Sequence, residues 1–181
     1  MLAWVVLIHS VSIQARSDGP PEVGDRAPDF VAVQLDGQEL DSATLLGRPT
    51  LLDFLGVWCP PCIEAFPDLR RLHDDFSPEG LQVVGLAVLS GTAEEVSAFL
   101  EEHDVQHPNV LIEIDVARAF GVVQYPAYVL LDHDGRVAAR YRHRPDGLYE
   151  AVAKDLEPLL HADSPPTPGP RACLTPRGPQ G

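Results

Sequence analysis

The stretch TLLDFLGVWCPPC at residues 50–62 carries the strongest structural signal in this chain. Its first part, residues 50–55, is a short and mostly apolar run, which predicts a buried strand. Cys59 and Cys62 then stand three positions apart, a spacing that can close a small disulfide ring at the start of a helix. There, free backbone N–H groups and the positive end of the helix dipole stabilise a thiolate. The two prolines between them suit a first helical turn, which does not need their missing N–H groups. A strand, a turn and a CxxC at a helix start predict a redox-active dithiol.

A zinc site is the alternative for the same two cysteines. Zinc would need two further ligands, and the sequence contains no second CxxC or closely spaced Cys/His pair, so no metal is expected. The third cysteine, Cys173, stands in a tail rich in proline and glycine. We interpret it as a bystander, and the alternative is an exposed thiol that forms an intermolecular disulfide.

Length and charge limit the classes of function. The 181 residues fit one domain with an appendage at each end, and we place the domain at residues 22–161. The chain has 13 basic and 27 acidic residues, a formal net charge of −14. This acidity argues against nucleic acid or an anionic membrane surface as a partner, and it favours a role in solubility.

Both ends of the chain differ in composition from the middle. Residues 1–21 begin with a mostly apolar segment, Met1–Ile13, that is too short to span a bilayer. Within it, Leu2–Ile8 could be the apolar region of a signal peptide, although no Lys or Arg precedes it. The segment fits either the remnant of an export signal or anchor, which would be the one route to membrane anchoring, or an ordinary N-terminal strand or frayed segment. In residues 162–181, half of the positions from Ser164 onward are Pro or Gly, which predicts a disordered tail.

Strand-like and helix-like segments alternate between these ends. The expected strands, besides residues 50–55, are Val31–Leu35, Gln38–Leu40, Leu81–Leu89, Val110–Ile114, Ala127–Leu131 and Arg136–Tyr141. The expected helices are Pro61–Asp75, a helix that runs to about His103 from a capping box at Thr92 and Glu95, Val116–Phe120 and Pro145–Leu160. Asp-Gly pairs join two of the strand pairs as hairpins. The pattern predicts an α/β fold with a mixed sheet and helices on both faces.

With these motifs in place, the chain resembles the thioredoxin fold, and within it the TlpA/ResA group of exported thiol–disulfide oxidoreductases. The entry motif Gly24–Phe30 is similar to one shared by that group and the peroxiredoxins, and Leu81–Pro108 with Val110–Ile114 resembles the group's central insertion. The segment Gly121–Tyr128, followed by Asp132–Gly135, completes the match. The resemblance implies a thioredoxin-like three-layer α/β/α architecture with a mixed central sheet, an N-terminal β-hairpin and that insertion.

The resemblance also assigns the surroundings of the cysteines. Pro126 corresponds to the cis-proline that faces the CxxC, where the family's backbone pairs with the extended chain of a substrate. Tyr125 precedes it, where the family more often has a small or β-branched residue; it either narrows the range of partners or simply packs. Trp58 is expected to shield the dithiol and shape its rim. We therefore expect Trp58, Tyr125 and Pro126 to bind substrate.

Asp53 stands six residues before Cys59, on the strand that leads to it. This position matches the buried acid of thioredoxin itself, whereas the TlpA/ResA group commonly has Asn there. A buried carboxyl has a raised pKa and can shuttle a proton to Cys62 near neutral pH. The alternative is a surface residue at a strand edge.

The function that the resemblance implies is thiol–disulfide exchange with protein substrates, with the protein acting as a reductant. Cys59 is expected to attack and Cys62 to resolve the mixed disulfide. No metal, flavin or nucleotide cofactor is needed, and an upstream thiol reductant would return the electrons. We expect a monomer located in the periplasm or another extracytoplasmic space, with the cytoplasm as the alternative.

Two other functions fit the sequence less well. A peroxiredoxin-like peroxide reductase needs Thr or Ser three residues before the peroxidatic cysteine, and Gly56 occupies that place before Cys59. A thioredoxin-like copper-delivery protein usually has three residues between its cysteines and a distant His or Met, whereas this chain has a CxxC and Met1 as its single methionine.

Overall fold

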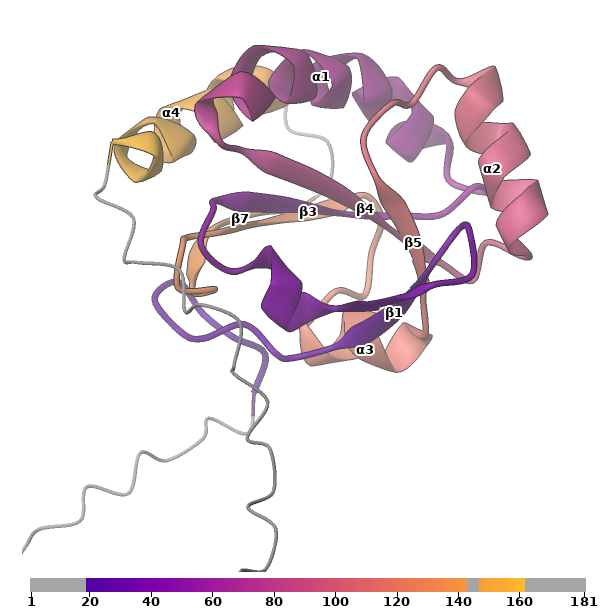
Figure 1. Ribbon diagram of the computed structural model, residues 1–181, viewed down its shortest axis with the longest axis horizontal. Coiled ribbons are helices and arrows are strands. Elements are labelled where there is room, and N and C mark those ends of the chain that lie inside the picture. The colour runs from indigo at the N-terminus through magenta and orange to yellow at the C-terminus, as the bar shows by residue number, and fades with distance from the viewer. Residues whose placement is uncertain (1–18, 143–146, 162–181) are drawn as a thin grey trace, which may run out of the picture.

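The computed structural model describes residues 19–142 and 147–161 (Figure 1). In chain order its elements are β1 (Val31–Gln34), β2 (Glu39–Asp41), η1 (Ser42–Leu45), β3 (Thr50–Leu55), α1 (Pro60–Phe76), η2 (Ser77–Glu79), β4 (Gln82–Val88), α2 (Ala93–Glu102), β5 (Asn109–Ile112), α3 (Ile114–Ala119), β6 (Ala127–Leu131), β7 (Val137–Arg142) and α4 (Leu148–Leu160).

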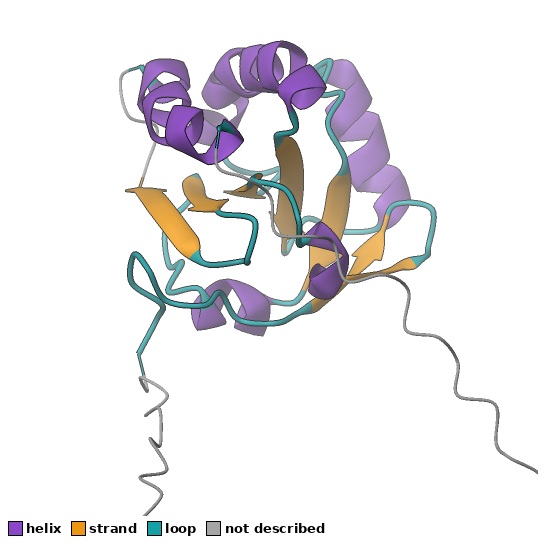
Figure 2. Cartoon of the chain, turned by 60° about the vertical axis from the view of Figure 1, so that its left-hand side comes forward, coloured by secondary structure: helices purple, strands orange, loops and turns teal. Residues whose placement is uncertain are grey.

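The seven strands form one mixed sheet in the order β2-β1-β5-β4-β3-β6-β7. The central strands β3, β4 and β5 are parallel, and the flanking pairs are antiparallel. Because β3 and β4 run side by side in the same direction, the loops that follow them emerge at the same edge of the sheet. The CxxC follows β3 and therefore lies at that edge. Figure 2 shows the strands of the sheet between the helices.

Alternation along β3 divides the core into two layers, because successive side chains of a strand point to opposite faces. Leu51 and Leu55 pack with buried residues of α1 and α4, whereas Leu52 and Phe54 join the cluster on the other face. There Phe120, just after α3, lies 5.3 Å from Phe54 between ring centroids. Figure 1 shows α1 and α4 above the sheet and α3 below it. The predicted three-layer α/β/α architecture with a mixed central sheet is confirmed.

The predicted elements differ from the observed ones mainly at their ends. The bounds Thr50–Leu55 and Ala127–Leu131 are as predicted. The last helix begins at Leu148, with Gly147 as its N-cap, rather than at the predicted Pro145. Pro145 itself belongs to residues 143–146, which lie outside the described part. The predictions for the N-terminal segment and for the tail with Cys173 fall almost wholly outside the described residues.

The capping box of α2 is confirmed. The Thr92 side chain accepts a hydrogen bond from the Glu95 backbone N–H, and the Glu95 carboxylate accepts one from the Thr92 N–H. Within residues 19–142 and 147–161, no helix is long and apolar enough to cross a membrane.

Candidate active site

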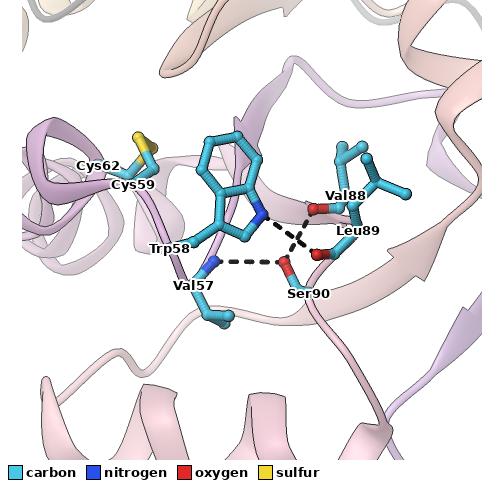
Figure 3. The surroundings of a disulfide bond; sticks show 7 residues. All are labelled: Val57, Trp58, Cys59, Cys62, Val88, Leu89 and Ser90. Atoms are coloured by element: carbon cyan, nitrogen blue, oxygen red, sulfur yellow. Dashed lines mark hydrogen bonds between the residues drawn. A yellow bond between two sulfur atoms is a disulfide. The ribbon is translucent and has the colours of Figure 1, made fainter.

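The two cysteines form a disulfide at the N-terminus of α1 (Figure 3). Cys59 is the N-cap residue, and Pro60 and Pro61 fill the first helical positions. The backbone N–H of Cys62 donates to the carbonyl of Cys59 at 2.9 Å, which closes the turn that brings the two sulfurs together. A thiolate released at Cys59 would stand at the positive end of a 17-residue helix.

The disulfide is less accessible than the motif suggests. Cys59 is 3% exposed and Cys62 is 1% exposed, so the two differ little in burial in this oxidised form. Both belong to the apolar cluster beneath α1, with Tyr125 packed against it. A substrate sulfur that reaches Cys59 must therefore also contact the side chains at the rim.

Trp58 is the most prominent of these side chains. Its ring meets that of Tyr125 edge to face, with centroids 5.5 Å apart and an interplanar angle of 86°. Its indole Nε1–H donates to the carbonyl of Leu89 at 3.1 Å. Gly56 is required beneath it, because a Cβ there would lie 2.5 Å from an indole carbon. The indole is thus fixed in orientation while the residue remains 52% exposed.

Sequence reasoning missed the turn that holds Trp58. Ser90, just after β4, accepts a hydrogen bond from the Val57 N–H at 3.3 Å and donates to the Val88 carbonyl at 3.0 Å (Figure 3). The Val57–Ser90 and Trp58–Leu89 hydrogen bonds join residues that are 33 and 31 positions apart. The one signal in the sequence is the Ser-Gly-Thr turn directly after a strand whose end faces the CxxC.

Pro126 lies at the same edge of the sheet. The Tyr125–Pro126 peptide bond is cis, and the next residue, Ala127, pairs with Phe54 of β3. Tyr125 is half-buried and contacts both core clusters, and burial raises the pKa of its phenol. The loop before β6 thus lies beside the end of the strand that leads to Cys59.

Asp53 is buried in the middle of β3, and the alternative of a surface residue is wrong. It is 1% exposed, and neither carboxylate oxygen has a hydrogen-bond partner among the described residues. It stands between Leu51 and Leu55, so its side chain points to the face of the sheet that also holds the cysteines. Burial raises the pKa of this carboxyl from 3.8 to about 8. The acid is therefore mostly protonated at neutral pH yet able to exchange its proton there.

The described residues offer no separate metal site. No group of three or more His, Cys, Asp or Glu side chains in this part of the chain is arranged to hold an ion. The site thus consists of a disulfide, a buried acid and an aromatic rim.

The sequence matches a known family. A model of the AhpC/TSA family matches residues 23–140, well over half of the chain. A methylamine utilization protein MauD from Paracoccus denitrificans is 32% identical over 149 residues, which cover 81% of this chain and 68% of that protein. A thiol-disulfide oxidoreductase ResA from Bacillus thuringiensis is 29% identical over 120 residues, covering 64% of this chain and 67% of the relative.

Solved structures share the fold of this chain. The thioredoxin domain of a thiol-disulfide oxidoreductase from Bacteroides vulgatus has a TM-score of 0.67 at 25% identity, covering 74% of this chain and 96% of that one. A structure described as a thiol:disulfide interchange protein DsbE from Chlorobium tepidum has a TM-score of 0.71 at 24% identity, covering 77% and 99%. The chain belongs to the AhpC/TSA family and is a thiol–disulfide oxidoreductase of thioredoxin-like fold.

Proposed function

We propose that the protein reduces disulfides of other proteins by exchange with the Cys59–Cys62 pair. The thiolate of Cys59 attacks one sulfur of a substrate disulfide, a mixed disulfide forms, and the other substrate sulfur leaves as a thiolate. Cys62 then attacks Cys59, releases the second substrate thiolate and forms the enzyme disulfide. The substrate gains two electrons and the enzyme dithiol loses two. The observation that carries this proposal is the disulfide at the N-terminus of α1, on the sheet face that holds the buried Asp53.

Asp53 is proposed to handle the proton of Cys62. Cys62 can attack only as a thiolate, and its position inside the first turn of α1, 1% exposed, keeps water from removing the proton. A carboxyl with a pKa of about 8 can accept that proton as its anion and return it when the disulfide is reduced.

The rim residues are proposed to bind the substrate chain. The fixed indole of Trp58 and the half-buried ring of Tyr125 border the disulfide, and the backbone before Pro126 would pair with an extended segment of the substrate. Protein thiols and disulfides are the substrates, and a separate thiol reductant regenerates the dithiol. We place this exchange outside the cytoplasm, a placement supported by the apolar segment Leu2–Ile8.

Substitution of each cysteine tests these roles. Cys59→Ser should abolish reduction of insulin disulfides, because a serine hydroxyl is hardly ionised near neutral pH and cannot begin the exchange. Cys62→Ser should instead accumulate a mixed disulfide through Cys59, because attack proceeds and resolution does not. Non-reducing electrophoresis and mass spectrometry would detect the trapped species. Accumulation in Cys59→Ser with normal turnover in Cys62→Ser would reverse the two roles.

Peroxide consumption, assayed beside insulin reduction, separates this function from a peroxidase. Gly56 stands where a peroxiredoxin needs a hydroxyl residue, and a Cβ there would collide with the Trp58 indole. We expect insulin turnover to exceed peroxide turnover by a wide margin. The reverse ranking would make the protein a peroxide reductase.

A further inference from the structure

Leu89 combines two unfavourable features at one position. Its backbone has a φ of 49°, in the left-handed region that a leucine rarely adopts because Cβ crowds the following carbonyl. The residue is 63% exposed, so burial of its apolar side chain does not offset that cost. Strained backbone and exposed apolar surface are both features that cluster at functional sites.

The position of Leu89 relates these features to the disulfide. Its carbonyl holds the Trp58 indole, and Ser90 after it binds the Val57 N–H, so the turn is fixed to the segment that enters α1. In Figure 3 the indole lies between the disulfide and the Val88–Ser90 turn. The exposed part of Leu89 therefore extends the apolar rim begun by Trp58 on the side of β4.

We propose that Leu89 determines substrate specificity by contacting an apolar side chain adjacent to the substrate's reacting cysteine. This inference rests on the proposed function and adds a substrate class to it, namely extended segments with an aliphatic neighbour of the cysteine. Because Cys59 is only 3% exposed, an incoming sulfur brings its neighbouring residues into contact with the rim. Contact between Leu89 and an apolar substrate side chain would remove the apolar surface of both from water. This burial would stabilise the complex in which the cysteines react.

Two model peptides test the proposal. Each carries a cysteine in a mixed disulfide with thionitrobenzoate, flanked on both sides by leucine in one peptide and by glycine in the other. Reduced enzyme attacks the peptide sulfur, thionitrobenzoate leaves as a coloured thiolate, and Cys62 then releases the peptide thiol. Stopped-flow absorbance gives kcat/KM for each peptide, and the ratio of the two values measures discrimination.

The expected ratio for the parent protein is about 5 to 10 in favour of the leucine peptide, as partial burial of two aliphatic groups implies. Leu89→Asn should bring the ratio to about 1 to 2, because asparagine tolerates the left-handed backbone but offers no apolar side chain. Leu89→Met keeps an apolar side chain and should keep the parent ratio. Val23→Asn is the matched control and should also keep the ratio. Val23 is 64% exposed, and its neighbour Gly24 is bound to Val137, at the end of the β6–β7 pair opposite Ala127.

Melting temperatures distinguish this role from a structural one. Leu89→Asn relieves the backbone strain, so its melting temperature should equal or exceed that of the parent while its discrimination is lost. A general structural defect would lower kcat/KM for both peptides together and leave the ratio unchanged, and that result would overturn the proposal. A parent ratio near 1 would overturn it too. Failure of the parent to release thionitrobenzoate from either peptide would overturn the proposed function, and this inference with it.

Discussion

At the scale of single residues, Asp53 is the most unusual group of the site, because it is an acid buried in the core. A carboxyl with both oxygens unpartnered among the described residues is costly to bury as an anion, and this cost raises its pKa to about 8. In a strand that is otherwise made of apolar residues and a buried threonine, such a group contributes little to packing. Its placement on the cysteine face of β3 favours a role in proton transfer.

Asp53→Asn tests that role. The variant should fold, because the amide resembles the protonated carboxyl in shape, but resolution of the mixed disulfide should slow near pH 7, where no base assists Cys62. We expect a loss of about 100-fold at pH 7, at the lower end of the usual range of general base catalysis. The deficit should shrink above about pH 9, where hydroxide deprotonates Cys62 unaided. Single-turnover kinetics from pH 6 to pH 10 would measure it, and a deficit independent of pH would contradict proton transfer.

Motif and spacing predicted the residues whose chemistry is local. Cys59 and Cys62 follow from the CxxC after a strand, and the burial of Asp53 follows from its place in that strand. The roles of Leu89 and Ser90 could not be predicted, because they depend on contacts with a segment more than 30 residues earlier and on a backbone φ. Leucine has no sequence preference that signals a left-handed conformation, so only the three-dimensional structure shows it.

At the scale of elements, the turn after β4 is anchored at both ends. On one side it is bound to Trp58, and on the other it leads into α2 through the capping box of Thr92 and Glu95. The strand and helix themselves were predictable from an apolar run and a cap signal, although their ends shifted by a residue. That this turn holds Trp58 at the rim could not be predicted, because the contact depends on the parallel pairing of β3 with β4.

Removal of the α2 cap tests how firmly that element is held. Thr92→Ala leaves the Glu95 N–H without its side-chain acceptor and should lower the free energy of unfolding by about 1 kcal/mol. Thr92→Ser retains the hydroxyl and should stay close to the parent. Urea unfolding followed by circular dichroism would compare them. Equal losses in the two variants would show that the threonine methyl, rather than the cap, stabilises the helix.

At the scale of the whole molecule, two buried groups make stability depend on pH in opposite directions. Asp53 has its pKa raised to about 8, so the native state holds a proton that the unfolded chain loses above about pH 4, and stability falls as pH rises from 4 to 8. His107 is 5% exposed, and burial, followed by the charge of His73, lowers its pKa to about 4. Its contribution is present above about pH 6.5 and is lost as pH falls to 4.

These opposing slopes should nearly cancel between about pH 4 and 6.5, because each amounts to about 1.4 kcal/mol per pH unit. Of these two groups, Asp53 alone still titrates relative to the unfolded chain above about pH 6.5, so its contribution should make the oxidised parent lose roughly 2 kcal/mol by pH 8. Asp53→Asn should remove that alkaline loss and reveal a rise in stability from pH 4 to 6.5, which belongs to His107. His107→Phe should do the opposite and show a continuous fall from pH 4 to 8. Urea unfolding at half-unit pH steps, with the disulfide kept oxidised, would record all three curves. An alkaline loss that persists in Asp53→Asn would mean that another group, rather than the buried acid of β3, couples folding of this molecule to pH.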